Sequence, residues 1–261
     1  MQDFSNNKSG LVYRRALLVL AVLQLGLALA FWDVPALPEA AAMHDLTRPP
    51  ELPPIGFFSI WFVIFATYLG FAIWAWREDN HVTRTLAVPL GLAGLCSLAF
   101  LILQRAGLTQ LELTPLVLVL WGVSAWAVQR FDLMRGMGGS PGKWAADATT
   151  GLIFGWVTLT LYLFLIGNVR DIYGLATTDA VWPFLLATLV LTGAMALASF
   201  ARLTASPYFL LAICWGLAGI FVNLWWITGL NAPAVIAGLF GIWLVRRRLR
   251  FGASGAKPAG L

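Results

Sequence analysis

Eight long apolar stretches with almost no charge divide this 261-residue chain, and they limit what it can fold into. Each approaches the roughly 20 residues that a helix, rising about 1.5 Å per residue, needs to cross a hydrocarbon core about 30 Å thick. The predicted spans are Ala16–Trp32, Phe57–Trp76, Thr85–Leu103, Leu113–Val128, Thr150–Gly167, Val181–Phe200, Pro207–Trp226 and Gly229–Val245. We therefore expect an all-α fold, a polytopic membrane helix bundle of about eight transmembrane helices.

The last two spans form one continuous apolar block in the sequence. The block from Pro207 to Val245 is too long for a single crossing. The stretch Gly229–Pro233 contains Gly, Asn and Pro, which favour a turn. We therefore place a helix on each side of it.

The basic residues test this count, because cytoplasmic loops hold most of the lysine and arginine of a membrane protein. With eight helices and a cytoplasmic N-terminus, only Arg48, Arg105 and Arg170 fall on the outer side. The basic residues on the inner side are then Lys8, Arg14, Arg15, Arg77, Arg84, Arg130, Arg135, Lys143, Arg202, Arg246, Arg247, Arg248, Arg250 and Lys257. An odd number of helices would reverse the side of the Arg246–Arg250 cluster, so both termini are predicted to be cytoplasmic.

The composition indicates that most of the chain lies in the membrane, with no separate soluble domain. Hydrophobic residues make up 60% of the chain and charged residues 11%, far from the values of soluble domains. The positive charges are dispersed along the span ends, so no nucleic-acid surface is expected. The apolar run over residues 11–32 lacks a small-residue cleavage site and is predicted to be a retained first helix. We expect a multi-pass protein of a bacterial-type inner membrane.

Several classes of membrane enzyme and transporter lack their characteristic residues here. His44 and His81 are the only histidines, too few for a histidine-rich iron site. Lys8, Lys143 and Lys257 all lie outside the spans, which excludes a retinal Schiff base. No ionisable residue falls at mid-depth, where ion-coupled transporters carry one. No Ser, His and Asp set shares a common depth, so the chain is predicted not to be an enzyme.

The chain contains 13 tryptophans, and most of them lie near span ends, as expected for interfacial aromatic belts. Trp121, Trp156 and Trp215 instead lie near the middle of their spans, and Trp61 lies about one turn inside its span. An indole N–H in lipid needs a partner, so such residues face the protein interior or a ligand. Two interpretations stay open: aromatic packing between helices, or a flat cavity for a planar hydrophobic molecule.

Two sequence segments resemble one known family. The run Pro53–Trp61 (PPIGFFSIW) resembles the proline-rich loop and second helix of TspO/MBR-type tryptophan-rich sensory proteins, the translocator protein family. The run Ala148–Thr158 (ATTGLIFGWVT) resembles that family's fifth helix, and Asn168 falls where a polar residue closes it. Phe65 stands where the family often has Tyr, and the third helix offers Ser97 and Gln104 in place of Asn and Trp.

The resemblance covers roughly residues 11–168 and implies a five-helix TspO/MBR-like bundle within residues 1–168. Residues 169–250 would then form three additional transmembrane helices, and residues 251–261 a flexible cytoplasmic tail. The family binds porphyrins or other planar hydrophobic molecules and acts in sensing, transport or tetrapyrrole handling. The implied partners are the lipid bilayer, a hydrophobic ligand and a second copy in a homodimer. No cofactor is required, and haem or porphyrin enters only as a ligand.

The resemblance also implies which residues line or close the ligand pocket. These are Pro53, Phe58, Trp61 and Trp156, with Phe65 as a position changed from the family. Trp121 and Trp215 are added from their depth in the spans alone.

Three other functions remain as alternatives. A small-molecule permease would move a neutral solute without ion coupling, because no midplane charge is present. An accessory or assembly subunit of a larger membrane complex would copurify with partners and bind no ligand. An enzyme acting on a lipophilic substrate ranks last, because the sequence offers no acid–base pair.

Overall fold

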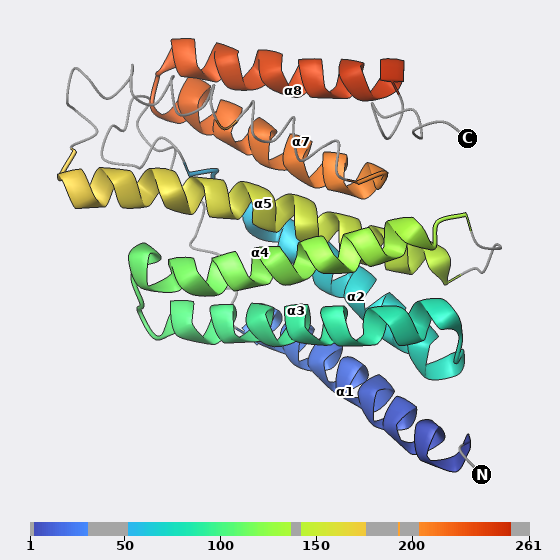
Figure 1. Cartoon of the computed structure of the whole chain (residues 1–261). Helices are drawn as coiled ribbons and strands as arrows, with labels where there is room; N and C mark the ends of the chain where they lie inside the picture. The colour runs from blue at the N-terminus through green and yellow to red at the C-terminus, as the bar shows by residue number, and fades with distance from the viewer. Residues whose placement is uncertain (1–2, 31–51, 137–141, 176–192, 194–203, 252–261) are drawn as a thin grey trace.

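A computed structural model describes residues 3–30, 52–136, 142–175, 193 and 204–251 (Figure 1). Every regular element in these ranges is helical. In chain order they are α1 (Asp3–Ala30), the 3-10 helix η1 (Ile55–Ser59), α2 (Ile60–Arg77), α3 (His81–Arg105), α4 (Gln110–Leu133), α5 (Lys143–Tyr173), α7 (Pro207–Val222), the π-helical turn η2 (Asn223–Ile227) and α8 (Asn231–Phe251).

Six stretches in the described ranges are long and apolar enough to cross a membrane, and each matches a predicted span. They are Val12–Ala30, Gly56–Arg77, His81–Arg105, Gln110–Leu133, Lys143–Tyr173 and Pro207–Ile227. The predicted span Gly229–Val245 forms most of the helix α8, which carries four arginines near its end. The predicted span Val181–Phe200 lies outside the described residues except for Gly193.

Local sequence signals explain where several helices begin and end. Asn80 and Thr83 form a reciprocal capping box at the start of α3, and Thr109 and Glu112 form one at the start of α4. Glycines with positive φ follow α3, α5 and the α7–η2 unit, namely Gly107 (87°), Gly174 (60°) and Gly229 (72°). The predicted break within Gly229–Pro233 occurs at Gly229 and Leu230, whereas residues 231–233 already form the start of α8.

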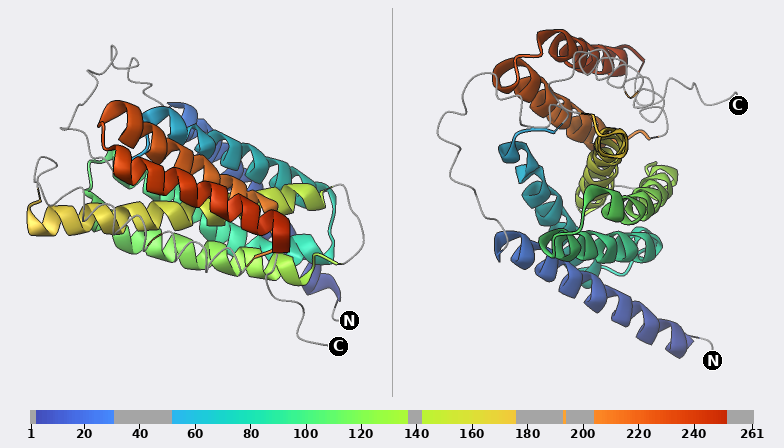
Figure 2. Two further views of the ribbon diagram at one scale, coloured as in Figure 1. Left: turned by 90° about the horizontal axis from the view of Figure 1, so that it is seen from above. Right: turned by 90° about the vertical axis from the view of Figure 1, so that its left-hand side faces the viewer.

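The helix α5 is the centre of the bundle. It is 31 residues long, because the helix continues on both sides of the predicted span Thr150–Gly167 until Gly174. Its apolar window is 78% buried, whereas the windows of the other five spans are 28% to 44% buried. Seen along the bundle, α5 lies between α7 on one side and α2 and α4 on the other (Figure 2, right). A helix that is apolar all round is expected at such a position.

The remaining helices are layered around α5. The helix α3 packs on α4, α1 packs on α2 and α3 at one edge, and α8 packs on α7 at the opposite edge. Glycines on α5 allow α7 to approach closely: a Cβ on Gly155 would lie only 2.9 Å from the Cβ of Ala212.

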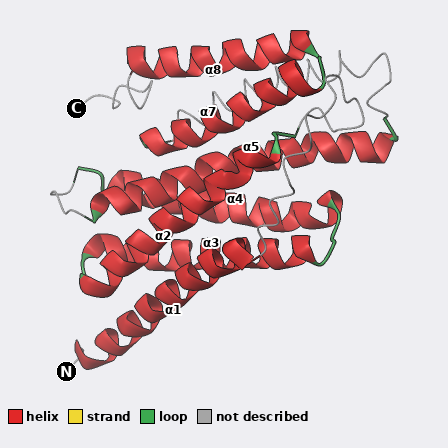
Figure 3. Cartoon of the chain, turned by 180° about the vertical axis from the view of Figure 1, so that it is seen from behind, coloured by secondary structure: helices red, strands yellow, loops and turns green. Residues whose placement is uncertain are grey.

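The two ends of the bundle differ in charge. The start of α1, the α2–α3 turn, the end of α4, the start of α5 and the end of α8 lie at one end (Figure 3). We call this end the basic end. Its described basic residues are Lys8, Arg14, Arg15, Arg77, Arg84, Arg130, Arg135, Lys143, Arg246, Arg247, Arg248 and Arg250. The α3–α4 and α7–α8 turns lie at the other end, whose described basic residues are Arg105 and Arg170. The start of α1 and the end of α8 thus lie at the same end of the bundle, and the cytoplasmic side of the basic end stays a prediction.

Candidate functional site

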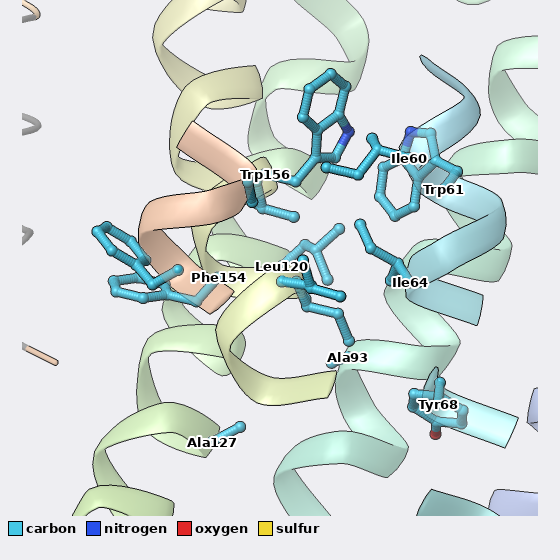
Figure 4. Packing of buried hydrophobic residues seen from close by; sticks show 14 of the residues in the cluster. Ile60, Trp61, Ile64, Tyr68, Ala93, Leu120, Ala127, Phe154 and Trp156 are labelled. Atoms are coloured by element: carbon cyan, nitrogen blue, oxygen red, sulfur yellow. The ribbon is translucent and has the colours of Figure 1, made fainter. Parts of the chain in front are cut away.

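Side chains from η1, α2, α3 and α5 place six aromatic rings between the middle of the bundle and the end opposite to the basic end, and we call them the aromatic cluster. Their ring contacts form two groups: Trp61, Phe65, Phe100 and Phe164 make one, and Phe58 and Trp156 make the other. Trp61 is stacked on Phe65 with ring centroids 5.3 Å apart, and Phe100 lies 6.4 Å from Trp61. Phe58 meets Trp156 edge-on at 5.7 Å. Figure 4 shows Trp61 and Trp156 facing each other across the core.

Trp156 is the largest fully buried side chain among the described residues. Its side chain is 1% exposed, and its indole Nε1 has no hydrogen-bond partner among the described residues. Gly216 of α7 leaves room chiefly for Leu159, and a Cβ there would also lie 3.3 Å from Cζ3 of Trp156. A buried donor without an acceptor is costly, so this N–H marks a place where an acceptor would be favourable.

Pro53 and Trp215 lie beside the cluster, where η1 meets α7. The indole Nε1 of Trp215 donates a 2.8 Å hydrogen bond to the carbonyl oxygen of Phe57, and the two rings are 5.1 Å apart. Gly219 faces Pro53 and Phe57, and a Cβ there would lie 2.8 Å from the Cβ of Pro53. Pro53 is buried by this contact, but Trp215 stays 41% exposed. These two residues hold η1 against α7 and thereby position Phe58.

Trp121 lies on a different side of α5. Its Nε1 donates a 3.1 Å hydrogen bond to Oγ1 of Thr158, and its ring lies 6.2 Å from Phe154. Residues 154 and 156 point about 200° apart around an α-helix, so Trp121 and Trp156 occupy opposite sides of α5. The structure thus brings Phe58, Trp61, Phe65 and Trp156 together and leaves Trp121 outside the cluster.

A family model described as TSPO-like protein matches residues 49–245, roughly three quarters of the chain. The chain belongs to this TSPO-like family. Together with the six membrane-length helices, this makes it a multi-pass membrane protein of the TspO type. Neither the curated proteins nor the solved structures contain a match.

The matched range begins after α1 and ends within α8. It therefore includes α7 and most of α8, whereas the resemblance predicted from the sequence covered roughly residues 11–168. The division of this TSPO-like protein into a five-helix bundle at 1–168 and three added helices stays a prediction.

A second buried polar group lies deeper in the bundle, between α1, α2 and α3. The hydroxyl of Tyr68 donates a 2.9 Å hydrogen bond to the carbonyl oxygen of Leu90. Gln24 of α1 is 1% exposed, and its Nε2 has no partner among the described residues. Both side chains lie directly against Gly94 of α3. The sequence analysis missed this group, although Gln24 is the one polar residue of its predicted span and was the available signal.

A charged network closes the basic end where α4, α5 and α7 meet. Arg135 follows α4 and donates to both carboxylate oxygens of Asp147 at 2.7 and 2.9 Å, and to Asp132 at 2.8 Å. The hydroxyl of Ser206 donates to Asp147 at 2.7 Å. Although burial opposes the charge on Arg135, the hydrogen bonds to Asp147 and Asp132 outweigh it and raise the pKa of Arg135. Arg248 of α8 donates to the carbonyl oxygens of Thr204 and Ala205, which joins α8 to the network.

Among the described residues, no group of three or more His, Cys, Asp or Glu side chains lies close enough together to hold a metal ion.

Proposed function

We propose that this TSPO-like protein binds a planar hydrophobic ligand of the tetrapyrrole type at the aromatic cluster, and acts as a sensor or ligand-handling protein. The observation that carries this proposal is the indole N–H of Trp156, which is buried without a partner among the described residues inside a group of aromatic rings. A ligand with a hydrogen-bond acceptor would satisfy that donor.

The orientation of the rings supports a flat ligand. The ring plane of Trp61 lies 25° from that of Phe65 and 29° from that of Phe100, so Trp61 is stacked on each of these two rings. Offset stacking is a favoured arrangement for aromatic rings, and a planar molecule that extends this stack would make the same kind of contact.

The polarity of the surroundings supports a mainly apolar ligand. Trp61, Phe65 and Trp156 are all less than 10% exposed, and the residues that pack against them are apolar. A charged group would lose its hydration here without gaining a counter-ion, so the propionate groups of haem or protoporphyrin IX would have to stay outside the cluster while the apolar macrocycle enters it. The rings already touch one another, so we infer that η1 moves with Phe58 when the ligand enters.

The experiment is a titration of the detergent-purified chain with haem and with protoporphyrin IX, followed by absorbance and tryptophan fluorescence. Trp156→Phe keeps an aromatic ring but removes the N–H, and we expect it to weaken binding by about 0.5–1.5 kcal/mol, the net value of one hydrogen bond. Trp61→Ala/Trp156→Ala should abolish saturable binding, because it removes two rings of the cluster.

The matched control is Trp144→Phe, which changes a tryptophan that is 60% exposed at the basic end. It should bind both probes like the unchanged protein. Equal affinity in the unchanged chain and in Trp61→Ala/Trp156→Ala would refute the site. A complete absence of saturable binding to either probe would refute the ligand class.

A further inference from the structure

Two copies of one five-residue pattern occur near the ends of α4 and α8. The pattern is Trp-x-Val-x-Arg, and it covers residues 126–130 and 243–247. Residues four apart lie on the same side of a helix, so each arginine lies one turn beyond its tryptophan. In α8 the guanidinium carbon of Arg247 lies 5.0 Å from the centre of the Trp243 ring, a cation–π contact.

The two patterns lie at the same level in the bundle, because both helices are tied to Ala205. The backbone N–H of Ala205 donates a 3.1 Å hydrogen bond to Asp132, two residues after Arg130. The carbonyl oxygen of Ala205 accepts from Arg248, one residue after Arg247. Both patterns therefore end at the basic end at a common depth.

The tryptophans of both patterns face outward. Trp126 is 38% exposed and Trp243 is 45% exposed, and Arg130 and Arg246 are exposed beside them. The outer surface of a membrane-spanning bundle meets lipid, and an exposed indole near a helix end sits at the level of the lipid headgroups. The neighbouring arginines then lie at the level of the lipid phosphates.

Three carboxylates at the basic end, those of Asp79, Asp132 and Asp147, are engaged elsewhere. Asp79 pairs with Arg84 at 2.7 Å and with Arg14 at 3.1 Å, and the hydrogen bond from Arg84 holds the pKa of Asp79 below its usual value. Asp132 and Asp147 form ion pairs with Arg135. Within the described ranges Arg130, Arg246 and Arg247 form no ion pair.

We propose that the two Trp-x-Val-x-Arg patterns, with Arg246, are binding sites for the phosphate groups of anionic phospholipids. The planar guanidinium binds phosphate oxygens through two parallel hydrogen bonds, and the indole fixes the depth of the headgroup. An anionic headgroup suits these sites better than a zwitterionic one, because unpaired arginines cluster there and the chain carries a net charge of +5.

The test uses native mass spectrometry of the full chain in detergent, titrated separately with phosphatidylglycerol and with phosphatidylcholine. The unchanged chain should retain phosphatidylglycerol in preference to phosphatidylcholine, and added salt should reduce that preference. Arg130→Gln and Arg246→Gln should each lower the affinity for phosphatidylglycerol about fivefold, and Arg130→Gln/Arg246→Gln/Arg247→Gln should lose the preference.

Arg105→Gln is the matched control, because Arg105 lies in the last turn of α3 as Arg130 lies in the last turn of α4, but at the opposite end of the bundle. It should keep the preference of the unchanged chain. Equal retention of the two lipids by the unchanged chain, or equal losses for Arg105→Gln and Arg130→Gln, would overturn the proposal. Arg130 and Arg246 are exposed and form no ion pair among the described residues, so misfolding of Arg130→Gln or Arg246→Gln is an unimportant cause of loss.

Discussion

At the scale of single residues, the buried polar atoms of this protein lie where glycine gives them space. Gly94 shows this most clearly, because the hydroxyl of Tyr68 and the amide of Gln24 both lie against its backbone. In the middle of a membrane helix such polar side chains need close neighbours, since lipid offers them no hydrogen bonds. The contact joins α1, α2 and α3 at one point.

Gly94→Ala should therefore destabilise the protein. The added Cβ would lie 2.6 Å from the Tyr68 hydroxyl and 2.8 Å from Nε2 of Gln24, closer than real carbon atoms approach. Overpacking of this kind costs about 1–3 kcal/mol, which a thermal unfolding scan in detergent would record as a lower melting temperature.

The control for this change is Gly122→Ala in α4. A Cβ on Gly122 meets nothing within 4 Å, so the substitution should be neutral or stabilising by up to about 1 kcal/mol. Identical melting temperatures for Gly94→Ala and Gly122→Ala would show that the Gln24–Tyr68 contact is looser than described.

At the scale of elements, two different interactions connect the helices around α5. Along the first turns of α7, Gly151 and Gly155 let α7 pack closely on α5. At the basic end, hydrogen bonds join the end of α4 to the starts of α5 and α7, with Asp147 as the shared acceptor. The first interaction depends on shape, and the second depends on charge.

Asp147→Asn should loosen the basic end. The substitution removes the charge that faces Arg135 and weakens two hydrogen bonds from its guanidinium, while the Asp147 side chain is only 15% exposed. Hydrogen bonds to charged groups contribute about 1.5–3 kcal/mol each at such sites, and we expect a loss of stability of about that size. Thermal unfolding in detergent measures it.

Asp171→Asn provides the comparison for Asp147→Asn. Asp171 pairs with Arg170, but its side chain is 54% exposed, and an exposed pair contributes roughly 0–1 kcal/mol. An equal and small effect of both substitutions would mean that the network at the basic end does not hold the helices together.

At the scale of the whole molecule, the sequence predicts where the helices lie better than it predicts which helices pack against one another. Apolar runs locate the spans, since crossing the membrane demands length and hydrophobicity alone. The same runs do not reveal that α5 is central, because lipid-facing and protein-facing sides are equally apolar. Trp121 and Trp156 share a depth, but only the packing of α4 and α2 on different sides of α5 separates them.

The side of the membrane on which the basic end lies is a property of the whole molecule, and the charge pattern predicts it to be cytoplasmic. Thiol labelling tests this in a chain whose native Cys96 and Cys214 are replaced by alanine. Gly136→Cys adds a thiol at the basic end and Ala106→Cys adds one at the opposite end; both positions are exposed. A membrane-impermeant thiol reagent should label Ala106→Cys in right-side-out vesicles and Gly136→Cys in inverted vesicles. The reverse pattern would place the basic end outside and would also move the proposed phospholipid sites to the outer leaflet.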